Sequence, residues 1–178
     1  MKVHEHHKHK APEEVHISLV IVSTTRYQEA IDGTQSSDKT LPLINEILSK
    51  FNKIVLESTH FIPDKIEKIK QILDEVISQK RIDAIIFSGG TGLSPKDITY
   101  ETIEPLMNKK LPGFGELFRF LSFEQIGPSA MLSRALAGTI KNKIIFLLPG
   151  SPNAVKLALK ELILPELGHI MYLLDKEE

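Results

Sequence analysis

The 178-residue sequence contains no cysteine, which excludes disulfide bonds, thiolate metal sites and cysteine nucleophiles. An excess of charge of one sign is also absent, because 22 Lys and Arg residues balance 23 Asp and Glu residues to a net charge of -1. Such a chain has no overall field that attracts nucleic acid or an anionic membrane. A charged ligand must therefore be held by a local arrangement of groups, and we expect neither nucleic acid nor membrane as a partner.

Long hydrophobic runs are missing as well. No apolar stretch approaches the roughly 20 residues of a membrane-spanning helix, and no signal-peptide pattern begins the chain. We therefore expect a cytoplasmic protein. With 42% hydrophobic and 25% charged residues, the composition is that of one globular domain with a full core.

The first fifteen residues differ from the rest of the chain. Four histidines alternate with lysines and a glutamate, and no apolar periodicity is present. We predict a flexible His-rich tail over residues 1–15 and a single domain over residues 16–178. Because His-rich tracts can bind transition metals, a metal-handling tail is one hypothesis. The alternative is a solvated tail with incidental metal affinity.

Beyond the tail, strand-like and helix-like segments alternate. The strand-like segments are continuous apolar runs, typical of strands covered on both faces, and the helix-like segments carry apolar residues at helical spacing. The expected strands are 17–22, 53–57, 82–88 and 143–148. The expected helices are 40–51, 64–79, 99–107, 115–121 and a segment from Asn153 onward. This alternation predicts a three-layer α/β fold, with a mainly parallel central sheet between helices.

A glycine-rich segment, Ser88 to Gly92, directly follows the third expected strand. A strand that ends in such a turn exposes backbone N–H groups, which can hold a phosphate without a dedicated cation. The two commonest phosphate motifs do not fit, because no lysine follows Gly92 and the glycine spacing is not that of a dinucleotide fingerprint. The alternative is a tight turn whose glycines only satisfy positive φ angles. This segment alone leaves both interpretations open.

Two aspartates follow expected strands. Asp64 precedes a helix with Glu67 three residues on, a capping-box pattern that explains the aspartate by itself. Asp97 follows Ser94 and Pro95, an expected N-cap and first helical residue, so its carboxylate can serve the helix dipole alone. However, the carboxyl ends of parallel strands meet at one edge of a sheet, where ligands bind. Both carboxylates are therefore expected at one site, since Mg²⁺ is typically held by one or two carboxylates plus substrate phosphates.

A second loop repeats the strand-turn-helix pattern. Pro149, Gly150 and Ser151 follow the last expected strand. Gly150 allows a close backbone approach, and Ser151 and Pro152 are suited to be the N-cap and first residue of the next helix. The loop can line a pocket, or it can be an ordinary connection.

Four motifs occur in a fixed order along the chain: SGGTGLSPKDIT at 88–99, PGFGELFR at 112–119, PSAMLSRALAG at 128–138 and LPGSPNAV at 148–155. Together they resemble the MoaB/MogA family, the molybdopterin adenylyltransferases of molybdenum cofactor synthesis. The resemblance extends over about residues 17–174. Each motif alone is weak, whereas their joint occurrence is highly specific.

The resemblance implies that ATP and molybdopterin are converted to adenylylated molybdopterin and pyrophosphate, with Mg²⁺ required. The two essential aspartates of the family match Asp64 and Asp97, which are thus the expected catalytic residues and Mg²⁺ ligands. The expected nucleotide-phosphate site consists of Gly89, Gly90, Thr91, Gly92, Pro149, Gly150 and Ser151. The residues that resemble the pterin-binding side are Ser23, Asp38, Ser133 and Arg134. Among them, Arg134 is the candidate for the terminal phosphate, because a guanidinium can bind it with two hydrogen bonds. The alternative for Arg134 is a helix-surface salt bridge.

The segment from Leu121 to Gly127 resembles MoaB-type members, some of which lack the first aspartate. This chain retains that aspartate as Asp64. The alternative function is nevertheless a non-catalytic, oligomeric molybdopterin-binding scaffold. The resemblance further implies a homo-oligomer, either a trimer or a hexamer built as a dimer of trimers, and contact with the metal-inserting enzyme of the same pathway.

Overall fold

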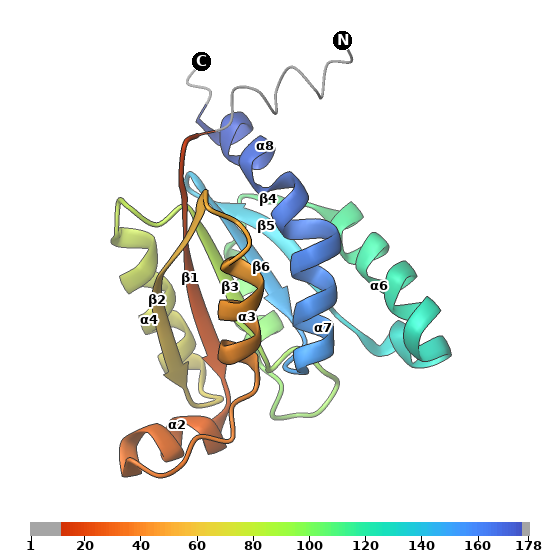
Figure 1. The fold of residues 1–178 in the computed structure, drawn as a ribbon. Coiled ribbons are helices and arrows are strands. Elements are labelled where there is room, and N and C mark those ends of the chain that lie inside the picture. Colours follow the sequence, from red (N-terminus) through yellow and green to blue (C-terminus); the bar gives the residue numbers. More distant parts are fainter. Residues whose placement is uncertain (1–11, 176–178) are drawn as a thin grey trace.

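The computed structural model describes residues 12–175, which form one six-stranded sheet with helices on both faces (Figure 1). The strands are β1 Val15–Val22, β2 Ile54–Ile62, β3 Ala84–Ser88, β4 Lys109–Lys110, β5 Leu136–Ile140 and β6 Lys143–Leu148. The helices are α2 Thr24–Asp32, α3 Thr40–Leu48, α4 Ile66–Ser78, α5 Thr99–Ile103, α6 Pro112–Ile126, α7 Pro152–Leu157 and α8 Leu164–Leu174. Short 3₁₀ segments span Glu104–Leu106 and Gly127–Leu132, and a π-helical segment spans Ala158–Ile163. The predicted three-layer α/β fold is confirmed.

The sheet has the strand order β2-β1-β3-β6-β5-β4. The first four strands in this order are parallel, and β5 and β4 are antiparallel additions at one edge. In the register, Val22 lies opposite Ile62, and Ser88 lies opposite both Ile21 and Leu148. Four parallel strands therefore end level with one another. The chain leads from β1 to β2 on one side of β1, and then to β3 on the other side. The point at which the strand order reverses in this way is a topological switch point, and it lies here between β1 and β3.

Along each central strand, successive side chains point alternately into two separate hydrophobic cores, one on each face of the sheet. Leu19 and Phe146 belong to the core under α3, α6, α7 and α8, whereas Val20 and Phe87 belong to the core under α4 and α5. Both faces are covered by helices (Figure 1), which explains the continuous apolar runs. Within residues 12–175, no helix is long and apolar enough to cross a membrane.

The sequence patterns do not predict α2, β4 or β5. Helix α2 consists mostly of polar residues and has no buried residue, so no core-facing side chains mark it. Strand β5 is short and joins β6 through a tight turn in which Lys141 has a φ of 53°. Strand β2 also continues to Ile62, beyond the expected end at Glu57, through a polar stretch. Residues 1–11 of the expected tail lie outside the described residues, and β1 already includes Val15.

Two isoleucines, one buried and one exposed, allow a test of which residues form the hydrophobic core. Ile144 on β6 is fully buried, whereas Ile31 on α2 is 60% exposed. We expect Ile144→Ala to lower the free energy of unfolding by about 2–5 kcal/mol, because it removes buried methyl groups and leaves a cavity. The matched control Ile31→Ala should change it by about 0.5 kcal/mol or less. Urea titration followed by circular dichroism measures both values, and equal losses would contradict this assignment of the core.

Candidate functional site

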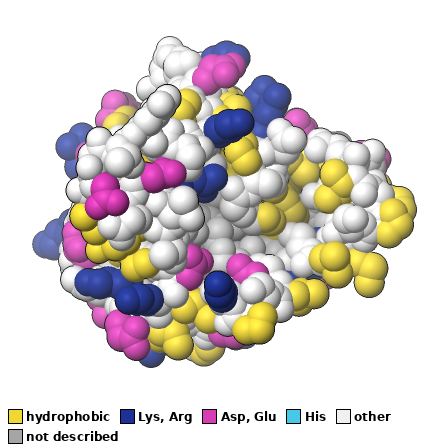
Figure 2. Space-filling model, turned by 90° about the horizontal axis from the view of Figure 1, so that it is seen from below, with side chains coloured by type: hydrophobic (Ala, Val, Ile, Leu, Met, Phe, Trp, Pro, Cys, Tyr) yellow, Lys and Arg dark blue, Asp and Glu magenta, His cyan; other side chains and the backbone are white. Residues whose placement is uncertain are grey.

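The candidate site lies at the carboxyl edge of the four parallel strands, where the loops after β1, β2, β3 and β6 come together. Figure 2 views this end of the molecule and shows a face that is hollowed near its centre. Two adjoining hollows of ≈ 440 and ≈ 640 Å³ lie there. The turn at residues 94–98 contributes residues to both of them. Such an edge, next to a switch point, is where ligands bind in open α/β sheets.

The loop after β3 is held in a conformation that requires glycine. Gly89 and Gly90 have φ angles of 109° and 66°. A Cβ atom at Gly89 would overlap the carbonyl oxygen of Val22, and one at Gly90 would overlap Oγ1 of Thr99. The Thr99 amide also donates to the carbonyl of Gly90 at 2.9 Å. Positive φ angles thus account for two of the glycines, as the tight-turn interpretation requires.

The same loop leaves several donors without partners. Among residues 12–175, the amides of Gly90, Thr91, Gly92 and Leu93 donate to no protein acceptor, and neither does the Thr91 hydroxyl. Thr91 is 3% exposed. Consecutive free N–H groups in such a turn make an anion-binding concavity. The tight turn and the phosphate cradle are therefore compatible descriptions of one loop.

The loop after β6 packs directly on the first one. A Cβ atom at Gly150 would lie 3.3 Å from Cα of Gly89, so the two backbones approach closely. Ser151 caps α7 as predicted, because its hydroxyl accepts from the Ala154 amide at 3.2 Å and Pro152 is the first helical residue. The cap fixes where this loop ends and the helix begins.

Asp97 closes a turn at the mouth of the site. Its Oδ2 accepts from the Ser94 amide at 3.0 Å, and its own amide donates to the Ser94 carbonyl at 2.8 Å. The expectation that Ser94 and Pro95 begin a helix is wrong, because α5 begins only at Thr99. A Cβ atom at Gly92 would lie 2.8 Å from Oδ2 of Asp97, so the carboxylate lies directly against the glycine-rich loop.

Asp64 has a different role from the capping box that the sequence suggests. Helix α4 has Lys65 at its N-cap position and no side-chain capping bond. The Asp64 carboxylate instead reaches α2, where its Oδ2 accepts from both the amide and the hydroxyl of Thr24 at 2.9 Å. An aspartate after β2 therefore anchors the first turn of the helix after β1, 40 residues earlier in the chain.

Most of the predicted site residues line one or the other of the two hollows. The first, which we call the GGTG pocket, contains the entire expected nucleotide-phosphate set and two further predicted residues. They are Gly89, Gly90, Thr91, Gly92, Pro149, Gly150, Ser151, Asp97 and Ser133. The second, which we call the Asp64 hollow, is lined by Ser23, Thr24, Thr25, Asp64, Pro95, Lys96 and Ile98. Asp97 and Asp64 thus face adjoining hollows on either side of one turn.

Arg134 lies beside the GGTG pocket, and most of its N–H groups are bound to protein atoms. Its guanidinium pairs with Glu101, and it also contacts carbonyls of the glycine-rich loop. The hydrogen bond from Arg134 lowers the pKa of Glu101, and the same bond raises the pKa of Arg134. Both groups are therefore charged at neutral pH. The expected terminal-phosphate role of Arg134 stays a prediction.

Of the other residues of the expected pterin side, Ser23 and Asp38 both contact Arg26, whereas Ser133 lines the GGTG pocket. Ser23 is the N-cap of α2 and accepts from the Arg26 amide at 3.4 Å. Asp38, with a side chain only 3% exposed, pairs with Arg26 at 3.3 Å and accepts from the Leu41 amide at 2.7 Å. Ser23 thus lines the same hollow as Asp64, and Ser133 lines the same pocket as the glycine-rich loop, while Asp38 accepts a hydrogen bond at the start of α3.

Sequence patterns do not reveal several residues around the site. Thr24 lies 40 residues before Asp64 in a helix with no buried residue, so its link to Asp64 has no sequence signal. Glu101 and Tyr100 gain their importance only from Arg134, whose guanidinium carbon lies 4.8 Å from the Tyr100 ring centre. Lys96 adds a cation to the Asp64 hollow, and its place between Pro95 and Asp97 is the one signal that points to it.

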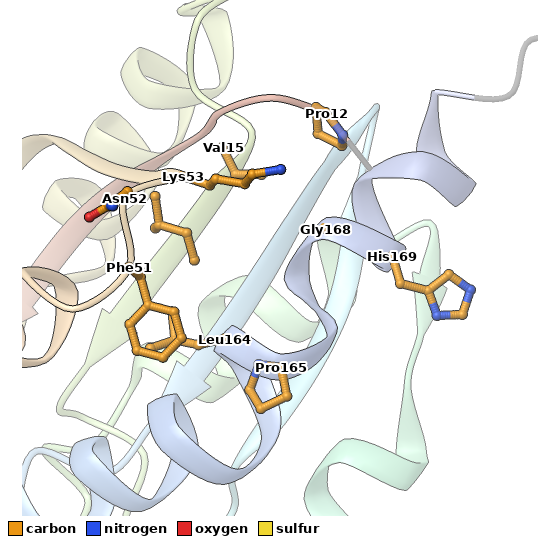
Figure 3. Close-up of a pocket in the computed structure, with 10 residues that line it drawn as sticks. Pro12, Val15, Phe51, Asn52, Lys53, Leu164, Pro165, Gly168 and His169 are labelled. Atoms are coloured by element: carbon orange, nitrogen blue, oxygen red, sulfur yellow. The ribbon is translucent and has the colours of Figure 1, made fainter. Parts of the chain in front are cut away.

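A third cavity, of ≈ 300 Å³, lies at the opposite, amino edge of the sheet. Figure 3 shows Phe51, Leu164 and Pro165 on its apolar side, while the ring of His169 points away from them. His169 also pairs with Glu166 at 3.1 Å. This cavity lacks the convergent polar groups of a reaction site. Within the described part of the chain, no cluster of three or more His, Asp or Glu side chains could hold a metal ion.

Comparison with known proteins identifies the family to which this chain belongs. Residues 18–169 match the family described as "Probable molybdopterin binding domain". The "Molybdenum cofactor biosynthesis protein B" of Bacillus anthracis is 42% identical, over 96% of this chain and 97% of the relative. A "Probable molybdopterin adenylyltransferase" of Methanocaldococcus jannaschii is 41% identical, over 92% and 96%. A crystal structure of a molybdenum cofactor biosynthesis protein B, 41% identical, superposes with a TM-score of 0.84 over 94% of this chain and 99% of the other. The chain belongs to the MoaB/MogA family of molybdenum cofactor biosynthesis proteins.

Proposed function

We propose that this chain is a molybdopterin adenylyltransferase that uses Mg-ATP and releases pyrophosphate. The observation that carries the proposal is the row of free amides in the glycine-rich loop, which lines the same pocket as Asp97 and lies beside the hollow that contains Asp64, at the carboxyl edge of the sheet. A relative of 41% identity carries the name of this activity.

In the proposed reaction, an oxygen of the pterin phosphate attacks the α-phosphorus of ATP. A new P–O bond forms, and the bond from the α-phosphorus to the bridging oxygen breaks, so that pyrophosphate leaves with the electron pair. Both reactants are anionic, so the protein must hold like charges together and stabilise the leaving group. The free amides of Gly90, Thr91 and Gly92 and the Thr91 hydroxyl supply donors for this purpose.

The two adjoining hollows suit a reaction of two phosphate-bearing substrates. The GGTG pocket takes the nucleotide phosphates, and Ser133 lies in its wall. The Asp64 hollow adds a second space that contains Lys96, whose ammonium attracts phosphate. Because the turn that carries Asp97 contributes to both spaces, the reacting phosphates meet beside this turn.

Asp64 and Asp97 fit the coordination chemistry of Mg²⁺. In each carboxylate Oδ2 is engaged, by Thr24 or by Ser94, while Oδ1 accepts no hydrogen bond from the described residues. Free carboxylate oxygens are the ligands that Mg²⁺ takes from proteins, together with water and substrate phosphates. When bound, the ion would neutralise charge on the phosphate oxygens.

One observation favours the alternative of a non-catalytic molybdopterin-binding scaffold. Asp64 anchors α2 through Thr24, so a structural need alone can account for this aspartate. The scaffold hypothesis predicts that the protein binds molybdopterin but forms no pterin-bound AMP with Mg-ATP.

Substitution of the two aspartates separates these functions. We expect Asp64→Asn and Asp97→Asn each to slow AMP transfer by roughly 100-fold or more, because several kcal/mol of metal-dependent charge stabilisation are lost. Asparagine keeps an acceptor oxygen for Thr24 or Ser94, so binding of molybdopterin should persist. The assay incubates the protein with molybdopterin and Mg-ATP and measures released pyrophosphate and pterin-bound AMP.

Asp74→Asn, on an exposed position of α4, is the control of equal charge change and should leave the rate unaltered. Full activity of both site variants would exclude the carboxylate assignment. Wild-type protein that binds molybdopterin yet transfers no AMP would instead establish the scaffold.

The proposal includes assembly into a trimer or a hexamer. Helix α6 and the 3₁₀ segment after it expose six large apolar side chains, each more than half exposed, beside the hollow in Figure 2. These are Leu117, Phe120, Phe123, Ile126, Met131 and Leu132. Because soluble monomers rarely expose large apolar patches, we take these side chains as part of a protein interface. The adenylylated product then passes, in the cytoplasm, to the metal-inserting enzyme of the same pathway.

A charge placed in this surface tests the assembly. We expect the wild-type chain to elute with the mass of three or six subunits in size-exclusion chromatography with light scattering. Phe120→Glu should shift the mass toward the 20.0 kDa of one chain, because a carboxylate would be buried without a partner. Ile31→Glu, on exposed α2, is the matched control and should not alter the mass. A wild-type monomer would refute this part of the proposal.

A further inference from the structure

The guanidinium of Arg134 joins two consecutive peptide groups of the glycine-rich loop to α5. Its Nε donates to the carbonyl of Thr91 at 2.9 Å, and its Nη2 donates to the carbonyl of Gly92 at 2.6 Å. Nη1 and Nη2 also donate to the carboxylate of Glu101, the latter at 3.1 Å. Four of the five N–H groups that an arginine possesses are therefore engaged by the protein.

These bonds fix the direction of two amides. In a trans peptide the C=O and the N–H point in opposite directions, so the amides of Gly92 and Leu93 face away from the guanidinium. Neither amide has an acceptor among residues 12–175. A cation on the carbonyl side also polarises each peptide group and strengthens it as a donor to an anion on the other side. Arg134 and a phosphate would thus act on opposite sides of the same peptide groups.

Glu101 keeps Arg134 in this place. The pair is supported by the Tyr100 ring, over which the guanidinium lies at 4.8 Å from the ring centre. The Arg134 side chain is 25% exposed and its bonds to the two loop carbonyls are partly buried, whereas the Glu101 side chain is 54% exposed. A carboxylate bound to the guanidinium also repels a second anion from it. The geometry therefore disfavours Arg134 as a direct ligand of the substrate phosphate.

We propose that Arg134 and Glu101 are positioning residues: Arg134 orients the Thr91 and Gly92 peptide groups so that the amides of Gly92 and Leu93 receive a phosphate, and Glu101 holds Arg134 to the loop. This inference rests on the proposed function only in taking the glycine-rich loop as the phosphate site. It assigns a role to Glu101 and gives Arg134 a role other than contact with the terminal phosphate.

Glu101→Gln distinguishes positioning from direct contact, because the two roles predict changes of opposite sign. If Arg134 bound the phosphate itself, the loss of the competing carboxylate would free the guanidinium and strengthen binding. If Arg134 positions the loop, the weakened pair lets the peptide groups move and binding weakens. We expect the dissociation constant of Mg-pyrophosphate, measured by calorimetry, to rise by about tenfold, or about 1.4 kcal/mol.

Amide NMR gives a readout that does not depend on activity. On addition of Mg-pyrophosphate to ¹⁵N-labelled wild-type protein, we expect the Gly92 and Leu93 amide signals to move, and to move less in Glu101→Gln. Glu104→Gln, which weakens the nearby Lys110 pair and changes the charge equally, is the control and should behave as wild type. Equal melting temperatures of the variants exclude a general loss of folding.

The outcomes also separate this inference from the proposed function. Wild-type protein that does not bind pyrophosphate would overturn the assignment of the loop as a phosphate site. Wild-type protein that binds it, together with a Glu101→Gln variant of equal or higher affinity, would overturn the positioning role alone. Weaker binding in the variant, with reduced shifts of the two amides, supports the positioning role.

Discussion

The close approach of three backbones at the carboxyl edge is the constraint on which the rest of the site depends. Parallel strands lie ≈ 4.8 Å apart, so the loops that leave β1, β3 and β6 have almost no room for side chains. Gly89 lies against the Val22 carbonyl on one side and against Gly150 on the other. Because both loops are glycine at this contact, the backbone itself forms the floor of the GGTG pocket, and its polar groups are the ones that a ligand there would meet.

Much of this arrangement follows from the sequence, because its causes are local. Continuous apolar runs such as residues 143–148 indicate strands covered on both faces, and parallel strands bring the loops that follow them to one edge. Ser151 and Pro152 signal the start of α7 by capping chemistry. The convergence of the glycine-rich loop, Asp97 and the loop after β6 could therefore be predicted without coordinates.

The remainder could not be predicted, because it depends on contacts between distant residues. Helix α2 buries no side chain and is fixed by Asp64, a residue that looks like the cap of its own helix. Strand β5 is only five residues long and begins inside the motif that contains Arg134. The partners of Arg134 lie 33 to 43 residues earlier in the chain. A motif can locate such a residue, but it cannot tell whether the side chain faces a ligand or the protein.

The unusual support of α2 has a thermodynamic consequence. This helix has no hydrophobic anchor, and its first turn is tied to the sheet edge by the Asp64 carboxylate. Under the proposed function, ligation at that carboxylate and the placement of α2 would be linked equilibria, in which each changes the other by the same free energy. The position of α2 would then report on the occupancy of the neighbouring hollow.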